Sequence, residues 1–525
     1  MNIFKDTFTE LAGYKSLREA IDKNISPVSV TGLSHIHRAQ LIHALGGKKI
    51  NLVITGTEAE AKKLCDDINT MAGCEEAVLF PSKELVFTPV DSTNHEYEHM
   101  RISALIKAAK NRCSVICASI EAVMQPVIPV GVLIAAGIEL TQGQEINLTN
   151  MALTLAKCGY QRCEKVEGAS QFSIRGSILD IFPVQSDKPV RIELWGDEID
   201  SISEFETDTQ RRTEALEKVE IYPSGEVLYD NDELADKIEE LCRKVRGKRM
   251  DAVREHLGAD VHRLRAGEIL AHSVKYYPLV YGDSSTVFDY IDGSVLFSDY
   301  SDVMDNAAGV LTRHNEDVKI LMEDGQLCKG LDGYVLELPE VQHIAEKKVC
   351  LYMSSFMQGG DRIDFRRLVS FEAMQTAAWS GEMKQLVEDL EDFRRRGYKM
   401  FLVAGSDKTL SIIQQDIEEN GIPCDILTDK SEAVSGRVLL MSGSLSGGFE
   451  YPENKVVLIT QGRSMDSVRR KRRKKKNKAE EIRSLADITE GDLVVHSGHG
   501  IGRFIGIRKL EMDGITKDYI TIFKN

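Results

Sequence analysis

Four short apolar runs alternate with helical patterns in residues 1–125, and this alternation restricts the fold more than any other feature of the chain. The runs read VSVTG, INLVITG, AVLFP and SVICAS. Strands that are separated by helices usually form a parallel sheet whose two faces those helices cover. The sequence therefore predicts an α/β fold with a parallel sheet in its amino-terminal part.

The chain changes character several times, and its 525 residues exceed what one hydrophobic core can organise. Length alone favours about three to five domains. Residues 126–225 read as antiparallel strands joined by Gly and Pro turns. We predict a parallel-sheet domain over 1–125, an antiparallel α+β domain over 126–225, a return to the first domain over 226–350, a second α/β domain over 351–462, a basic linker over 463–486 and a partial small β-barrel over 487–525.

The stretch VTGLSHIHRAQ, residues 30–40, lies where strand, glycine turn and helix would place a phosphate-binding loop. Such a loop needs glycines that let backbone N–H groups approach the phosphates, a lysine that neutralises them, and a hydroxyl that holds Mg²⁺. With the stretch aligned on Gly32, the motif's first glycine is Ser29, its second is Ser34, its lysine is His35 and its hydroxyl is Ile36. All four differ from the motif, so we expect a degenerate nucleotide loop and assign no catalytic residue.

Other motif-like patterns have surroundings that favour ordinary structure. DEID at 197–200 follows Trp195 and a glycine, which predicts solvated acids at a hairpin rather than a Walker-B strand. His496 and His499 form an H-x-x-H pattern without a third metal ligand nearby. The ten cysteines contain no C-x-x-C pair, which favours reduced thiols over a zinc site. We therefore predict no metal.

Eight consecutive cations, RRKRRKKK at residues 469–476, stand out in a chain whose net charge is −16. Like charges in a run repel one another and cannot pack into a core, which predicts an extended, solvated linker. The run is either a charged tether or an electrostatic contact with nucleic acid or an acidic protein surface. The candidate contact residues are Arg469, Arg470, Lys471, Arg472 and Arg473.

Two predicted strands, 172–182 and 190–205, form the most informative surface pattern. Arg191, Glu193 and Trp195 alternate with the apolar Ile192 and Leu194, so the three should share one face of a sheet. Arg and Trp are enriched at the centres of protein interfaces, which favours a protein-binding face. The alternative is a salt-bridged outer face with Trp195 folded over it. On the first strand we place Phe172, Ile174, Ile178 and Leu179 near a core and Arg175 at the turn.

These strands and the carboxyl-terminal segment carry a resemblance to a known family. FSIRGSILDIFPV with VRIELWGDEIDSISEFETDTQRR resembles the segment shared by the excision-repair protein UvrB and the transcription-repair coupling factor (Mfd) family. LADITEGDLVVHSGHGIGRFIGIRKLEMDGITKDYITI is similar to that family's RNA-polymerase-interacting, CarD-like domain. Residues 80–105 also resemble the coupling factors and are too short for the DNA-clamping hairpin of UvrB. The tandem identifies the chain as a member of the coupling-factor family.

The resemblance implies a UvrB-like, helicase-type sheet with a decayed ATP site, into which a UvrA-binding domain is inserted. Family members recognise stalled RNA polymerase, displace it by translocating on double-stranded DNA, and recruit UvrA to lesions for nucleotide-excision repair. The implied contact residues are Arg175, Arg191, Trp195 and, beside them, Glu193 for UvrA, and Leu510, flanked by Ile507, Lys509 and Glu511, for the polymerase β subunit.

The family's motor, which uses ATP and Mg²⁺, is a separate RecG-like pair of domains that the resemblance does not reach. We therefore expect no cofactor and no enzymatic activity in this chain, and a carboxyl-terminal truncation at Asn525. A UvrB-like DNA-binding ATPase or helicase is the alternative, and a nucleic-acid-binding protein acting through the basic run is a third. No apolar run approaches the ~18 residues of a membrane span, which favours a cytoplasmic protein, expected to be a monomer without membrane contact.

Overall fold

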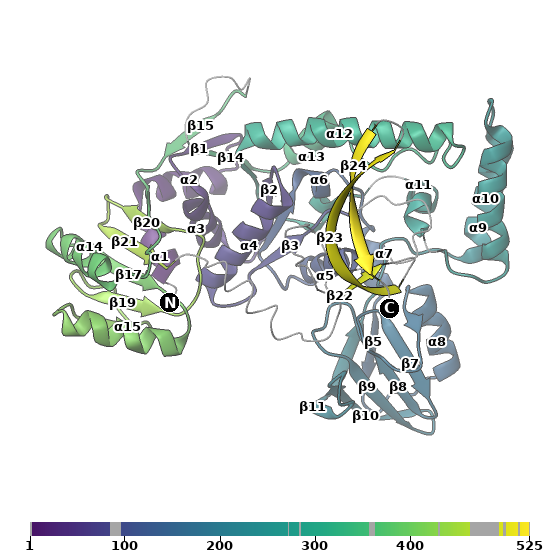
Figure 1. Ribbon diagram of the computed structural model, residues 1–525, viewed down its shortest axis with the longest axis horizontal. Coiled ribbons are helices and arrows are strands. Elements are labelled where there is room, and N and C mark those ends of the chain that lie inside the picture. Colours follow the sequence, from purple (N-terminus) through teal and green to yellow (C-terminus); the bar gives the residue numbers. More distant parts are fainter. Residues whose placement is uncertain are drawn as a thin grey trace. The chain divides into compact units, whose positions relative to one another are not determined.

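The structure is a computed structural model, and it describes residues 3–83, 96–270, 272–282, 285–355, 363–428, 431–461, 493–496, 500–512 and 515–523. The chain divides into two compact units, Met1–Gly462 and Arg463–Asn525. Figure 1 traces both units in sequence colours. None of the helices in the described ranges is long and apolar enough to cross a membrane.

A seven-stranded sheet organises the first unit, and every pairing in it is parallel, as predicted. The predicted boundary at residue 351 cuts through this sheet, because two strands from beyond residue 349 flank the first strand of the chain. The order is β15 (Arg367–Ser370), β1 (Val28–Thr31), β14 (Cys350–Ser354), β13 (Val295–Ser298), β2 (Asn51–Thr55), β4 (Val115–Ser119) and β3 (Ala77–Phe80).

Helices cover both faces of this sheet, so its strands carry apolar residues on both sides. On β2, Val53 belongs to one core, while Leu52 and Ile54 belong to the other. The amino-terminal stretch forms two helices. The helices of this part are α1 (Ile3–Thr9), α2 (Ala12–Asp22), α3 (His35–Leu45), α4 (Glu58–Ala72), α5 (Glu96–Ala109), α6 (Ile120–Val123), α7 (Val130–Ala135), α12 (Tyr300–Glu323) and α13 (Leu338–Ala345).

A domain with a mainly antiparallel sheet is inserted between β4 and β13, as predicted for this part of the chain, and only β6 and β7 pair in parallel among its described strands. Helix α8 (Leu148–Lys157) packs on one face of its six-stranded sheet through the buried Leu155 (Figure 1). The sheet order is β11 (Arg212–Leu216), β10 (Glu198–Phe205), β9 (Val190–Trp195), β8 (Ile178–Ile181), β7 (Gln171–Arg175) and β6 (Gln161–Arg162), and β5 (Ile138–Thr141) pairs with β12 (Lys218–Ile221) beside it.

A helical segment links the inserted domain back to the sheet. Figure 1 shows α9 (Asn231–Lys244) and α10 (Met250–Arg265) side by side, followed by the short helices η1 (Ser273–Tyr276) and α11 (Tyr277–Tyr281). The stretch STVFDYI has the apolar and aromatic content of a strand, yet it forms the 3-10 helix η2 (Val287–Tyr290). Thr286 and Asp289 form a capping box there, and this local hydrogen bonding favours a helical turn over an extended strand.

The second α/β layer shares a core with the first sheet. Helices α14 (Met383–Arg395) and α15 (Asp407–Glu419) are followed by Gly397 and Gly421, whose φ angles of 79° and 77° are in the left-handed region where helices commonly end. The sheet order is β16 (Met374–Thr376), β20 (Gly448–Tyr451), β21 (Val456–Thr460), β17 (Lys399–Val403), β19 (Val438–Met441) and β18 (Cys424–Ile426).

The second unit contains three antiparallel strands, β22 (Leu493–His496), β23 (Gly500–Met512) and β24 (Ile515–Phe523). Gly502 lies within β23, so the G-x-G pattern around it is followed by a strand, as expected, and not by the helix of a dinucleotide site. The predicted small β-barrel goes beyond these three strands and stays a prediction. His499 of the H-x-x-H pattern lies outside the described residues.

Candidate functional site

The face of the inserted sheet that lies opposite α8 gathers the predicted partner-binding residues. Strand β9 has the burial alternation that the sequence predicts: Ile192 and Leu194 are buried, while Arg191, Glu193 and Trp195 point to the other side. Strand register adds residues from β7 and β8 to this side, because Arg191 pairs with Asp180 and Glu193 pairs with Ile178. We call this surface the outer face; its members are Arg175, Ile178, Asp180, Arg191, Glu193 and Trp195.

Asp180 is the centre of the outer face, and sequence reasoning missed it. Its side chain is buried, and it accepts hydrogen bonds from two arginines. Oδ2 lies 2.6 Å from Nη2 of Arg175 and 2.9 Å from Nη2 of Arg191, and Oδ1 lies 2.7 Å from Nε of Arg191. The cluster of Arg175, Asp180 and Arg191 holds two positive charges and one negative charge, so its net charge is positive.

The side chain of Arg191 is held within the sheet by hydrogen bonds and has little exposed surface. Its side chain is only 13 % exposed. Besides its two bonds to Asp180, it donates to the carbonyl oxygen of Gln210 at 3.2 Å and lies 4.7 Å above the ring of Phe205. The hydrogen bond to Asp180 raises the pKa of Arg191 above its usual value. Its partner Asp180 lies directly opposite it on the neighbouring strand β8, and the pattern of a single strand does not reveal such a pairing.

Arg175 and Trp195 are the accessible members of the outer face. The Arg175 side chain is 51 % exposed and uses one guanidinium nitrogen on Asp180. Trp195 is 84 % exposed at the end of β9, so it does not fold over the sheet. Glu193 is tied to Arg212 of β11 by an ion pair and accepts from Ser201 at 3.3 Å. The outer face is therefore salt-bridged, as one sequence alternative expects, while Trp195 and Arg175 stay accessible on it.

Ile178 lies on the outer face, whereas we had placed it near the core. Side chains alternate along a strand, so Ile178 and Leu179 cannot share a side. Leu179 is the buried one, and Ile178 is half-buried between Arg175 and Glu193. The acids of DEID lie beyond this patch, at the exposed hairpin between β9 and β10, as predicted.

The degenerate nucleotide loop follows the expected strand, turn and helix, but its residues serve packing. Ser29 lies inside β1 and is buried. Gly32 has φ +85°, and a Cβ there would lie 2.1 Å from the carbonyl oxygen of Phe371. Ser34 caps α3 in a capping box with His37. His35 approaches Asp67 of α4 at 3.6 Å, and Ile36 is buried in the core.

Arg38 occupies the space next to this loop, at the carboxyl ends of the parallel strands. Its Nε donates to the carbonyl oxygen of Leu33 at 3.1 Å. Its guanidinium forms a two-pronged ion pair with Asp299 and donates to Ser298 at 2.9 Å and to Ser355 at 3.0 Å. Ligands of open parallel sheets bind at this edge. Here the buried Arg38 and the partly exposed Asp299 form an ion pair from within the chain at this edge.

Helix α3 is buried between the two α/β layers and packs against both. Every residue from Ile36 to Leu45 is buried. Gln40 donates to the carbonyl oxygen of Phe4 and accepts from the hydroxyl of Tyr451 of β20, each at 2.8 Å. Burial lowers the pKa of His37 to about 4, so this imidazole is neutral near pH 7. The helix from Ile36 to Leu45 therefore serves the packing between the two layers.

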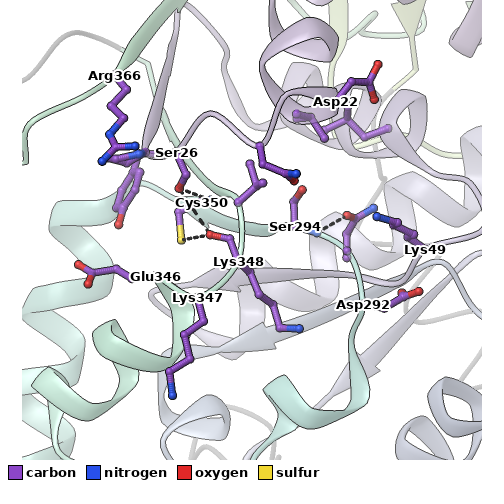
Figure 2. A pocket seen from close by; sticks show the side chains of 18 of the residues that line it. Asp22, Ser26, Lys49, Asp292, Ser294, Glu346, Lys347, Lys348, Cys350 and Arg366 are labelled. Atoms are coloured by element: carbon purple, nitrogen blue, oxygen red, sulfur yellow. Dashed lines mark hydrogen bonds between the residues drawn. The ribbon is translucent and has the colours of Figure 1, made fainter.

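A cavity of about 1430 Å³ lies at the opposite, amino-terminal edge of the central sheet (Figure 2). Residues that precede β2, β13 and β14 line it, including Lys49, Asp292, Lys347 and Lys348. Cations and carboxylates both surround it, so its charge does not select one class of ligand. Among the described residues no group of His, Cys, Asp and Glu is arranged to hold a metal ion, and all ten cysteines are free thiols.

Comparison with known proteins follows the same division of the chain. A UvrB interaction domain matches residues 138–226, which hold the outer face, and a CarD-like/TRCF RID domain matches residues 488–523. A transcription-repair-coupling factor of Bacillus subtilis (strain 168) is 28 % identical over 97 % of this chain and 44 % of its own length. The chain is a relative of the transcription-repair-coupling factors. This confirms the family that we predicted from the sequence.

Further transcription-repair-coupling factors give the same picture. Those of Staphylococcus haemolyticus (strain JCSC1435) and Staphylococcus aureus (strain MRSA252) are each 25 % identical over 94 % of this chain and 43 % of their own length. The chain thus spans less than half the length of these coupling factors.

Residues predicted to contact the polymerase lie together on one strand of the second unit. Ile507, Lys509, Leu510 and Glu511 all belong to β23 and pair with β24, with Leu510 opposite Lys517. This strand lies inside the match to the polymerase-interacting domain of the coupling factors. The candidate nucleic-acid residues Arg469 to Arg473 lie outside the described residues.

Proposed function

We propose that this chain is a binding module of transcription-coupled nucleotide-excision repair, which recruits UvrA through the outer face and contacts the RNA polymerase β subunit through β23. The observation that carries the proposal is the exposed indole of Trp195 on the same face of the sheet as the Arg175–Asp180–Arg191 cluster. The matches to a UvrB interaction domain and to a CarD-like/TRCF RID domain support it.

In this proposal some residues of the outer face contact UvrA and others hold those residues in position. Arg175 and Trp195 make the partner contacts, because they are exposed and because Arg and Trp are the side chains that most often dominate interface energies. Arg191 acts through Asp180, which it holds in position under Arg175. Glu193, paired with Arg212, fixes the neighbouring strands and lies at the rim. The net positive charge of the cluster fits an acidic patch on UvrA.

The polymerase contact uses Leu510 as its apolar anchor, with Ile507, Lys509 and Glu511 on the same strand. In this proposal double-stranded DNA and the family's ATP-driven, Mg²⁺-dependent translocation belong to the full-length coupling factor. No nucleotide, metal or catalytic step is assigned to the described residues.

The first test measures UvrA binding by the chain and by its Arg175→Ala variant with calorimetry. We expect the variant to bind UvrA at least tenfold more weakly, a loss of about 1.4 kcal/mol, because an exposed cation of the contact patch is removed. Its unfolding temperature should not change. Arg191→Ala should lower both the affinity for UvrA and the unfolding temperature, because the buried carboxylate of Asp180 would lose its main partner.

Lys157→Ala is the matched control, because Lys157 is an exposed cation on α8, which covers the other face of the same sheet. It should bind UvrA like the unmodified chain. The proposal fails if the chain does not bind UvrA, or if Lys157→Ala weakens binding as much as Arg175→Ala.

The alternative function, a UvrB-like ATPase, gives an opposite expectation for nucleotide binding. A nucleotide present at ten times its Kd would stabilise the protein by about 1.4 kcal/mol and raise its unfolding temperature. We expect no shift with millimolar ATP and Mg²⁺, because Arg38 and Asp299 occupy the edge where the phosphates would lie. A saturable rise in a thermal-shift titration would contradict this prediction.

A further inference from the structure

We propose that the tip of the α9–α10 hairpin, residues 243–254, is a binding surface for the phosphate backbone of double-stranded DNA. This surface shares no residue with the outer face or with the basic run at 469–476. It does not depend on UvrA recruitment.

The tip concentrates positive charge in a chain that is acidic overall. The whole chain carries −16, yet one acid, Asp251, stands among the cations of this short stretch. All of these cations are exposed. They are Arg243, Lys244, Arg246, Lys248, Arg249 and Arg254.

Four of the six cations also have local structural roles. Arg243 and Lys244 form i,i+4 ion pairs with Glu239 and Glu240 in the last turns of α9. Arg246 donates to the carbonyl oxygen of Arg243 at 2.6 Å, and Arg254 donates to that of Cys242 at 3.2 Å. Cations at the carboxyl end of a helix are stabilising, so helix stability alone accounts for these four.

Lys248 and Arg249 are not explained in that way. They stand at the amino-terminal end of α10, where Arg249 is the N-cap residue and makes no capping hydrogen bond with its side chain. Positive charge there opposes the helix dipole, and Ser, Thr, Asp or Asn would stabilise this position. Within the described part of the chain, neither side chain forms an ion pair. Helix stability therefore does not account for these two exposed cations, and their charge is accessible to an external anion.

The surroundings favour a phosphate backbone over an acidic protein. Specific protein interfaces need an apolar or aromatic centre, and the described residues 243–254 expose no large hydrophobic side chain. Contacts with DNA phosphates need only exposed cations. A hollow of about 660 Å³ continues the surface onto α12, where Lys319 joins Lys248 and Arg249. Glu323 and Asp332 also line this hollow and would limit the contact to the tip.

The test uses a fluorescein-labelled DNA duplex of about 20 base pairs and the full chain, with Kd measured by anisotropy between low and moderate salt. The double variant Lys248→Gln/Arg249→Gln should bind at least tenfold more weakly in low salt. Each lost phosphate contact lowers the slope of log K against log salt by about 0.9, so the slope should fall by roughly 1.8. The helix content should stay the same or rise.

Two matched variants isolate the tip. Lys62→Gln/Lys63→Gln removes the same charge from two adjacent exposed cations of α4 and should leave Kd unchanged. Arg472→Gln/Arg473→Gln weakens any contribution of the basic run, and the tip variant should cause the same fold-loss in that background.

Three results would overturn the proposal. The first is DNA affinity that the tip variant does not alter. The second is an equal loss in the α4 variant, which would indicate a general charge effect. The third is unchanged DNA binding with lost binding to purified RNA polymerase, which would assign the tip to an acidic protein surface.

Discussion

Trp195→Ala should weaken UvrA binding by about 2 kcal/mol or more, which is roughly 30-fold in Kd, while the stability of the chain stays within about 0.5 kcal/mol. The indole is 84 % exposed, so the folded chain loses almost no packing when it is removed. In a complex the same indole would bury a large apolar area beside Arg175. Calorimetric titration with UvrA measures the first quantity and urea unfolding the second.

Two variants sharpen this expectation. Trp195→Phe keeps an aromatic ring and should retain most of the affinity. Leu153→Ala removes an exposed apolar side chain from α8, on the covered side of the same sheet, and should leave UvrA binding unchanged. If Trp195→Ala binds UvrA as tightly as the unmodified chain, the indole is not part of the contact, and Arg175 is the remaining candidate.

Glu226→Ala should destabilise the first unit by about 3–5 kcal/mol, because it leaves two buried cations without a counter-charge. Glu226 is buried where the chain leaves the inserted domain, 2.6 Å from Nε of Arg101 and 3.2 Å from Nζ of Lys83. Burial alone would raise the pKa of Glu226, but Arg101 and Lys83 lower it below the usual value. The urea midpoint of the variant measures the effect.

The matched control is Glu139→Ala. Glu139 pairs with Lys218 at 3.0 Å in the same inserted domain, but both side chains are more than half exposed. A surface pair contributes about 0–1 kcal/mol, so this midpoint should hardly move. Equal midpoints for the two variants would mean that water reaches the Glu226 cluster.

Local patterns predicted the elements of the fold, and long-range pairing decided how they assemble. The continuous apolar run of β2 and the amphipathic pattern of α14 each correspond to one element, so the sequence signal suffices. The neighbours of β1 come from residues beyond 349, and no local pattern indicates such a partner. Residues 287–290 have the apolar and aromatic content of a strand, but they form a 3-10 helix because Thr286 and Asp289 make a capping box there.

The candidate site divides in the same way. Alternation along β9 placed Arg191, Glu193 and Trp195 on one face, because a strand has a fixed period of two. That Arg191 is engaged by Asp180, while Arg175 stays exposed, depends on the register of β8 against its neighbours. The sequence alone predicts a degenerate nucleotide loop, because Ser29, Ser34, His35 and Ile36 all differ from the phosphate-loop motif. The ion pair of Arg38 with Asp299, which fills the site, joins residues far apart in the chain.

The parallel sheet also sets an order of events during synthesis. Strand β1 pairs only with β14 and β15 in the described sheet, so more than 300 residues separate its emergence from that of its neighbours. At about 5–20 residues per second, β1 waits roughly 15–65 seconds on the ribosome. The strands from β7 to β10 lie within residues 171–205 and can pair as soon as they emerge. We therefore expect the inserted domain to be native before the sheet that holds it has closed.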